Sequence, residues 1–212
     1  MEPTINLRDK REQTICLLGG VEMDVVIDVT KKVIETNRLI LRAWQETDLE
    51  DFYEYASVEG VGENAGWRHH ESIEDSRSIL KNFISSKDEF AITDRNNNKV
   101  IGSLGLHRSW ANDDSKFIDL KLKDIGYVLS KDYWGRGLMP EAVKAVIDFC
   151  FDDLKLDAIT SGHSPSNHQS KRVIEKNGFV YVKTSDYYSE QFNLHTHSMR
   201  YILFSISRKE CG

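Results

Sequence analysis

The stretch that decides the fold is Trp134-Gly-Arg-Gly-Leu-Met-Pro-Glu-Ala142. The segment 117–130 before it predicts a long strand, since Ile125, Tyr127 and Leu129 share one face, and Gly126 is a plausible bulge in it. Pro140 suits the first turn of a helix, which we expect to continue to about Phe151. The two glycines let the backbone turn and approach a ligand, and the first amides of a helix have no partner within it. This arrangement is suited to a phosphate or pyrophosphate.

The glycine turn is not one of the common nucleotide-binding motifs. It lacks the GxGxxG spacing of a dinucleotide fingerprint, and no Gly-Lys-Ser/Thr follows as in a P-loop. An isolated Gly-x-Gly also fits an ordinary tight connection between a strand and a helix. The rest of the sequence has to decide between the two interpretations.

Composition excludes several protein classes. The chain has 212 residues, of which 40% are hydrophobic and 29% charged, so we expect one soluble globular domain with a real core. A formal charge of −6 argues against a general nucleic-acid binder. No apolar run approaches the ~20 residues that cross a membrane, and the charged N-terminus does not resemble a secretory signal. The three cysteines are far apart, which favours reduced thiols in a cytoplasmic protein and no metal site.

The order of the predicted elements indicates an α+β domain with a central mixed sheet. Residues 1–36 form an N-terminal extension of unknown role, in which alternation over 21–29 suggests a strand, and residues 37–212 form a single domain. Segment 60–66 is expected to be a loop. The expected strands are 38–44, 89–93, 100–107, 117–130, 156–162, 179–183 and 198–206. The expected helices are 46–57, 72–85, one with Pro140 in its first turn that ends at about Phe151, and a short one bracketed by Asn167 and Gly178.

A second motif favours the interpretation of the glycine turn as a ligand-binding site. It runs from Asn167-His-Gln-Ser170 to Glu175-Lys-Asn-Gly-Phe179. Together with Asn37-Arg-Leu-Ile-Leu-Arg42, Asp124-Ile-Gly-Tyr127 and the glycine turn, it resembles the GNAT superfamily of N-acetyltransferases, specifically the ribosomal-protein-alanine N-acetyltransferase-like branch. The four stretches occur in order across about 37–206. The resemblance implies a mostly antiparallel mixed sheet, splayed at a bulged strand, with helices on both faces.

The resemblance also implies a binding site for acetyl-CoA. The pantetheine arm would pair with the backbone of the splayed strand, the diphosphate would lie on the amides of the glycine turn, and Asn167 would hydrogen-bond the pantetheine. Lys176 and the other basic side chains of the last helix would be near the 3′-phosphate. These side chains also fit an exposed charged helix face. The implied cofactor-binding residues are Tyr127, Val128, Leu129, Ser130, Trp134, Gly135, Arg136, Gly137, Leu138, Met139, Asn167 and Lys176.

The chain departs from the family pattern at three positions. Many members have a tyrosine seven residues after the asparagine, as the acid that protonates the CoA thiolate, but this chain has Ile174. Ser170 is the substitute that the branch implies, and its other interpretation is a hydroxyl that caps the helix. Trp134 and Met139 replace the usual Gln/Arg and Gly/Ala, and Trp134 either covers the cofactor or packs inward.

The chemistry of amine acetylation requires a base and an oxyanion donor. A lysine amine has a pKa of about 10.4 and an α-amine about 8, so the acceptor must lose a proton. Asp124 and Glu141 are the candidate bases. Asp124 also fits a solvated carboxylate at a strand end, and Glu141 also fits an acidic residue that stabilises the first turn of a helix. A backbone N–H near Val128 would serve the oxyanion. The candidate acceptor-binding residues, which also fit a solvated loop, are Trp67, His69 and His70.

We therefore expect an N-acetyltransferase that moves an acetyl group from acetyl-CoA to a primary amine. The leading acceptor is the N-terminal α-amine of a protein, through the branch resemblance alone. The alternatives are a small amine such as a polyamine, amino acid or antibiotic, and a catalytically silent acyl-CoA-binding module. We expect no nucleic-acid or membrane partner, and the sequence leaves a homodimer open.

Overall fold

The computed structural model describes residues 25–189 and 191–205. Its centre is an eight-stranded sheet in the order β1-β2-β3-β4-β5-β6-β8-β7, in which every pair is antiparallel except β5 with β6. The strands are β1 Ile34–Glu35, β2 Leu39–Ala43, β3 Glu89–Asp94, β4 Val100–His107, β5 Leu122–Leu129, β6 Ala158–His163, β7 Val180–Ser189 and β8 Leu194–Phe204. The helices are α2 Leu49–Ala56, α3 Val61–Ala65, α4 Ile73–Ser86, α5 Leu138–Asp152 and α6 His168–Lys176.

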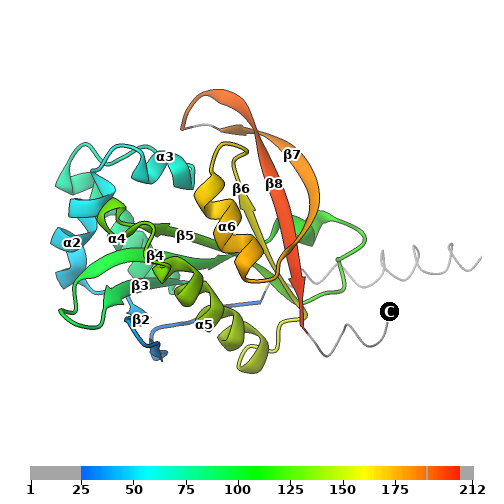
Figure 1. Ribbon diagram of the computed structural model, residues 1–212, viewed down its shortest axis with the longest axis horizontal. Coiled ribbons are helices and arrows are strands. Elements are labelled where there is room, and N and C mark those ends of the chain that lie inside the picture. The colour runs from blue at the N-terminus through cyan, green and yellow to red at the C-terminus, as the bar shows by residue number, and fades with distance from the viewer. Residues whose placement is uncertain (1–24, 190, 206–212) are drawn as a thin grey trace, which may run out of the picture.

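The predicted α+β class with a mixed, mostly antiparallel sheet is confirmed. Alternation along the strands divides the core in two, since successive strand side chains point to opposite faces. In β3, Phe90 and Ile92 pack in the cluster that α5 covers, whereas Ala91 belongs to the cluster of α2 and α4. Helices therefore cover both faces of the sheet, and Figure 1 shows α2, α3 and α4 gathered at the end away from β7 and β8.

Strands β5 and β6 separate partway along their length. They pair only from Leu122↔Ala158 to Asp124↔Thr160, and beyond this point the Ser161 hydroxyl donates to the carbonyl of Ile125 at 3.0 Å. On its other side β5 pairs with β4 from Asp124 to Leu129, and the register does not shift at Gly126. The predicted splay is confirmed, but this pairing has no bulge at Gly126, because the sheet opens between β5 and β6 instead.

Several predicted boundaries need correction. Strand β5 begins at Leu122 rather than 117, because successive backbone turns fold residues 114–120. Segment 60–66 contains the short helix α3, bounded by Gly60 and Gly66 at φ +88° and +94°. Five residues are too few to show a helical period in sequence. Residues 25–29 of the predicted strand 21–29 are not in a strand, and the rest of it lies outside the described residues.

Candidate active site

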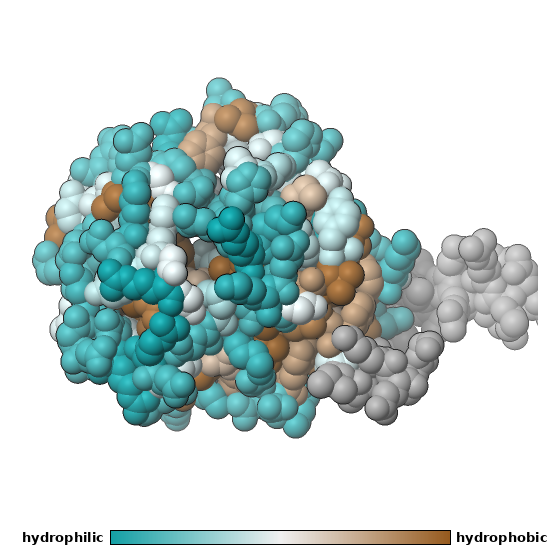
Figure 2. Space-filling model, in the orientation of Figure 1, coloured by the Kyte–Doolittle hydropathy of each residue, from teal (hydrophilic) through white to brown (hydrophobic). Residues whose placement is uncertain are grey.

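A cavity with a volume of about 860 Å³ opens where β5 and β6 part. Its walls come from α3, β5, the glycine turn at residues 134–139, the start of α5, and α6. Figure 2 shows a hollow near the middle of this mostly hydrophilic face, beside α6. The predicted cofactor-binding residues that line this first pocket are Tyr127, Val128, Leu129, Trp134, Gly135, Gly137, Leu138, Met139, Asn167 and Lys176.

Two predicted residues lie outside this lining. The N–H of Ser130 donates to the carbonyl of Ile101 at 2.7 Å, which ties it to the sheet. The Arg136 guanidinium lies 5.1 Å from the ring centre of Tyr133, and Arg136 is absent from the pocket lining. Neither side chain therefore contributes to the pocket wall, and any part that Arg136 takes in diphosphate binding would come from its backbone.

The glycine turn has the backbone geometry that its sequence predicts. Gly135 and Gly137 have φ values of +76° and +74°, in the left-handed region that other residues enter at a cost of about 1–2 kcal/mol. A Cβ added to Gly135 would meet nothing within 4 Å, so conformation rather than space requires glycine there. Gly137 is the N-cap of α5, whose first amides border the pocket. A diphosphate fits this end, since helix N-termini carry unpaired donors and a positive dipole.

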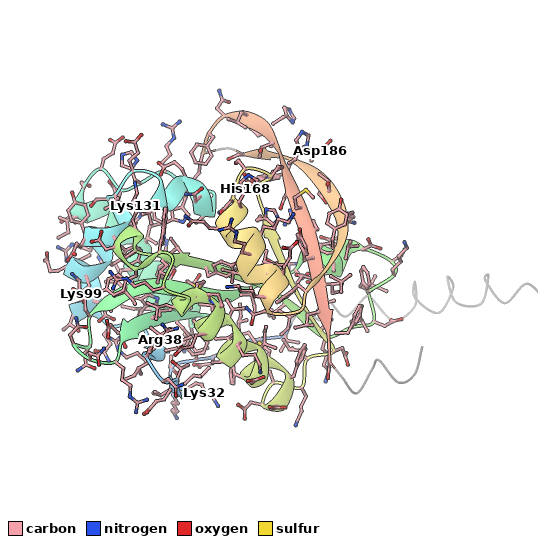
Figure 3. The ribbon with its side chains drawn as sticks, viewed as in Figure 1. Lys32, Arg38, Lys99, Lys131, His168 and Asp186 are labelled. Atoms are coloured by element: carbon pink, nitrogen blue, oxygen red, sulfur yellow. The ribbon has the colours of Figure 1, made fainter. Side chains whose placement is uncertain are left out.

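Arg38 holds the glycine turn from outside. Its guanidinium donates to the carbonyls of Arg136 at 2.9 Å and Gly137 at 3.2 Å, while its Nε donates to Glu141 Oε2 at 2.7 Å. Figure 3 labels Arg38, which extends from the start of β2 toward α5. One side chain thus fixes two carbonyls of the turn, so that their peptide groups keep one orientation.

The placement of Glu141 argues against a role as base. Its carboxylate accepts from the Thr36 hydroxyl at 2.6 Å as well as from the backbone and side chain of Arg38. Burial raises the pKa of Glu141, but the hydrogen bonds from Thr36 and Arg38 outweigh it and leave this pKa lowered. Glu141 does not line the pocket. The structure therefore makes it an anchor for the N-terminal segment and corrects the prediction.

Trp134 packs inward, so its side chain does not take over the interactions of the Gln or Arg that is usual at this position in the family. Its indole N–H donates to the carbonyl of Leu129 at 2.8 Å. One acceptor of the splayed strand is therefore already occupied. Met139 is also largely buried, in the cluster beneath α5. Both departures are accommodated by packing, and the backbone of the turn stays exposed to the pocket.

Tyr127 and Ser170 form a hydroxyl pair on the pocket wall. The phenol lies 2.9 Å from the serine Oγ and 3.2 Å from the Ser170 carbonyl oxygen. Burial raises the pKa of Tyr127 above its usual value of 10.0, so the phenol is protonated at neutral pH. The sequence predicted only the Tyr127 backbone as a functional part. A phenol is therefore present in the pocket although position 174 lacks one.

Asn167, rather than Ser170, caps α6. Its Oδ1 accepts from the N–H of Ser170 at 2.9 Å, and its Nδ2 donates to the carbonyl of Asn64 at 2.8 Å. The second bond joins α6 to the end of α3 across the mouth of the pocket. Because the cap is Asn167, the Ser170 hydroxyl is available to Tyr127, which removes the capping interpretation of Ser170.

Asp124 is half-buried where β5 and β6 part. Thr160 donates its hydroxyl to Asp124 Oδ1 at 2.5 Å, and Arg200 and His107 are close enough to act on its charge. Burial is the largest effect and raises the pKa of Asp124, against the opposing influence of these neighbours. Asp124 lines the first pocket, as a candidate base must. A carboxylate with a raised pKa can accept a proton nearer neutral pH than an ordinary aspartate.

A second pocket, of about 560 Å³, meets the first at β5. Both are lined by Ala65, Gly126, Tyr127 and Val128. Trp67 and His70 line the second pocket, with ring centres 5.1 Å apart. His69 lines neither pocket, because its imidazole contacts α3 instead: Nδ1 lies 2.9 Å from the Glu63 carboxylate. The structure therefore brings together two of the three predicted acceptor-binding residues and corrects His69.

The sequence interpretation missed Glu89 and His107, which also line the second pocket. Glu89 opens a short strand, and a charged residue at a strand end is ordinarily solvated, so no local signal singles it out. Only the strand register brings it to the pocket. In the described ranges, no group of three or more His, Cys, Asp or Glu side chains could hold a metal ion. No helix among the described residues is long and apolar enough to cross a membrane.

Comparisons with known proteins agree with this geometry. The sequence model of the family described as acetyltransferase (GNAT) domain matches residues 38–180. The chain belongs to the GNAT acetyltransferase family. It is an acetyl-CoA-dependent N-acetyltransferase.

Its relatives include the uncharacterized N-acetyltransferase YoaA of Bacillus subtilis, 28% identical over 152 residues that cover 69% of this chain and 82% of YoaA. A GNAT-family acetyltransferase structure from Bacillus anthracis superposes with a TM-score of 0.71 at 22% identity, covering 82% of this chain and 98% of that one. The ribosomal-protein-S5-alanine acetyltransferase of Vibrio fischeri gives a TM-score of 0.65 at 20% identity, covering 82% and 97%. At these identities the two structures show the shared fold.

Proposed function

We propose that this GNAT enzyme acetylates the N-terminal α-amine of a protein in the cytoplasm. The observation that carries the proposal is the meeting of two pockets at residues 126–128 of β5. One pocket ends in a helix N-terminus suited to a diphosphate, and the other contains aromatic and acidic side chains suited to an amine. The ribosomal-protein branch resemblance, and a structural neighbour named as a ribosomal-protein-alanine acetyltransferase, favour a protein α-amine as the acceptor.

In this proposal the first pocket holds acetyl-CoA. The amides of the glycine turn bind the diphosphate, Arg38 keeps that turn in one conformation, and Lys176 reaches the 3′-phosphate. The pantetheine pairs with backbone groups of β5 beyond Asp124, where the pairing with β6 has ended, other than the carbonyls of Ile125 and Leu129, which already accept hydrogen bonds. Asn167 has two contacts already, and its amide retains one donor and one lone pair for the pantetheine.

The chemistry then needs three groups around the thioester. The amine nitrogen attacks the acetyl carbon as the carbon–sulfur bond breaks, and the electron pair leaves on sulfur. A backbone N–H near Val128 stabilises the developing oxyanion, and the Tyr127–Ser170 pair donates a proton to the leaving thiolate. Asp124 accepts a proton released by the amine, because its half-buried carboxylate has a raised pKa.

A turnover assay that follows release of the free CoA thiol tests the acceptor. The panel contains peptides with a free α-amine, the same peptides with a blocked α-amine and an internal lysine, polyamines and single amino acids. We expect turnover with the free α-amine peptides alone. Turnover confined to polyamines or amino acids would replace this acceptor by a small amine, and acetyl-CoA binding without turnover on any acceptor would contradict the proposal.

A further inference from the structure

A row of three residues crosses the sheet beneath the second pocket. The register pairs Glu89 of β3 with Gly105 of β4, and Gly105 with Gly126 of β5. Directly paired residues of antiparallel strands point to the same face, so the two glycines leave a gap beside the glutamate. A Cβ at Gly105 would lie 2.3 Å from Glu89 Oε1. The Glu89 carboxylate therefore lies over Gly105, toward the strand that both pockets share.

The Glu89 carboxylate is buried but only half satisfied. Its Oε1 lies 3.2 Å from Nε2 of His107, whereas its Oε2 is buried without a hydrogen-bond partner among the described residues. The residue is 7% exposed and lines the second pocket. Leaving a buried carboxylate oxygen unpaired is costly, so a site of this kind favours a ligand that brings a donor.

His107 leads from this carboxylate to the shared strand. Its ring lies against Gly126, where an added Cβ would be 3.3 Å from Cδ2 and 3.4 Å from Nε2. The hydrogen bond to Glu89 raises the pKa of His107, which favours the charged form of the imidazole beside the carboxylate. This contact uses one carboxylate oxygen and orients the other.

The opposite wall of the second pocket is aromatic. Phe52, Trp67, His70 and Phe83 line it, and the ring of His70 lies 5.3 Å from that of Phe52 and 5.1 Å from that of Trp67. Aromatic rings beside a carboxylate suit a cation attached to an apolar group. The pocket thus combines an acidic side chain that has one unpaired oxygen with an apolar surface.

We propose that Glu89 binds the ammonium group of the acceptor in the second pocket, and that the aromatic wall holds an apolar group next to it. This inference rests on the proposed amine acetylation and names the class of acceptor, a primary amine with an apolar neighbour. Glu89 then selects a positively charged nitrogen and places it beside Gly126, where the two pockets meet. His107 is a positioning residue, since it acts through the carboxylate.

Calorimetric binding of a matched pair of probes tests the inference without turnover. Phenethylamine carries the ammonium group, and phenethyl alcohol has the same ring and chain without the charge. The full chain, saturated with CoA, should prefer the amine by at least about tenfold, the range of a charge-assisted hydrogen bond. Glu89→Gln keeps the size of the side chain and should remove this preference, while the affinity for acetyl-CoA stays unchanged.

Asp88→Asn is the matched control. Asp88 is the adjacent carboxylate, its Oδ2 lies 4.0 Å from Nδ1 of His107, and it does not line either pocket. This variant should retain the preference for phenethylamine. Equal loss in both variants, or an unchanged preference in Glu89→Gln, would overturn the assignment.

The wild-type protein provides a second measurement that needs no variant to fold. The titratable groups close to Glu89 are His107, Asp88 and Tyr55, and the pocket is also lined by Arg68, His70 and Asp75. Burial raises the pKa of Glu89, so lowering the pH from about 8 toward 4.5 should increase the protonated fraction of its carboxylate. The preference for phenethylamine should therefore fall between about pH 8 and pH 4.5. An unchanged preference over this range would overturn the inference.

Kinetics separate the failure of this inference from the failure of the proposed function. On any acceptor that the enzyme acetylates, Glu89→Gln should raise the KM for the amine at least about tenfold and leave the KM for acetyl-CoA unchanged. An equal rise in both KM values contradicts the role of Glu89 even if protein α-amines are acetylated. Turnover of small amines alone, with the KM shift intact, contradicts the protein acceptor and supports Glu89.

Discussion

The hydroxyl pair of Tyr127 and Ser170 can be tested by removing each oxygen in turn. Tyr127→Phe deletes a phenol that lies 2.9 Å from the serine Oγ, and Ser170→Ala deletes the other hydroxyl. Because burial raises the pKa of Tyr127, the phenol keeps its proton at neutral pH and can donate it. If the pair protonates the leaving thiolate, both substitutions should slow turnover without weakening acetyl-CoA binding.

The expected magnitudes distinguish a catalytic pair from a structural one. A neutral hydrogen bond contributes about 0.5–1.5 kcal/mol to stability, so either variant should lose about 1 kcal/mol of unfolding free energy. Loss of a general acid lowers the rate by about 10²–10⁴-fold, which corresponds to about 3–5 kcal/mol in the activation free energy. The effect on kcat should therefore exceed the effect on stability several times over.

A double-mutant cycle provides the decisive measurement. Turnover is followed by release of the CoA thiol, and acetyl-CoA affinity by calorimetry. If the two hydroxyls act in series, the double variant should be no slower than the slower single variant. Tyr201→Phe is the control, since its phenol is also largely buried and contacts His163 at 3.2 Å but lines neither pocket. A kcat within about threefold of wild type in both single variants, or effects that multiply, would refute the reasoning.

Three further predictions concern the turn and its surroundings. Gly137→Glu should abolish acetyl-CoA binding in calorimetry, because it places a negative charge at the turn. Gly137→Ala should add only about 1–2 kcal/mol of backbone strain. Equal acetyl-CoA affinities in the two variants would contradict the turn assignment. Arg38→Met should weaken acetyl-CoA binding about tenfold, while Arg77→Met, a similarly exposed arginine paired within α4, should not; no difference between them argues against the clamp. Although burial raises the pKa of Glu63, hydrogen bonds from His69 and Gly60 lower it to about 2, so this carboxylate stabilises the fold above pH 4.5 and loses that effect as pH falls toward 2. Urea unfolding of Glu63→Gln should therefore approach wild type at low pH, and a constant difference would disprove it.

Most of the fold could be predicted because its elements are locally encoded. The hydrophobic pattern of the sequence predicts strands β3 and β4, and an apolar stripe predicts helix α5. The Gly-Arg-Gly pattern predicts the turn, whose two glycines adopt left-handed conformations. The helix α3 could not be predicted, since its five residues show no period. The separation of β5 from β6 was predicted only through the family resemblance, because nothing local to β5 specifies where its neighbour departs.

The sequence predicts those features of the candidate site that depend on local backbone conformation. It does not predict the side chains that reach the site only through the register of paired strands or through long-range contacts. The glycine turn and the splayed strand need only local conformation. Glu89, in contrast, reaches the second pocket through two successive strand pairings, and the phenol of Tyr127 meets Ser170 across 43 residues. Glu141 was misassigned because a carboxylate in the first helical turn near a predicted pocket does not reveal that Arg38 binds it.

These long-range contacts explain why four short stretches, each of modest information, identify the family together. Arg38 of the first stretch binds the carbonyls of the glycine turn, and Tyr127 of the second binds Ser170 of the fourth. The four stretches are thus joined around one pocket, in two pairs linked by hydrogen bonds. A change in any one should alter its bonded partner, so Arg38→Met is expected to reduce acetyl-CoA affinity although Arg38 does not line the pocket. If that affinity is unchanged, the order of the stretches reflects the fold alone.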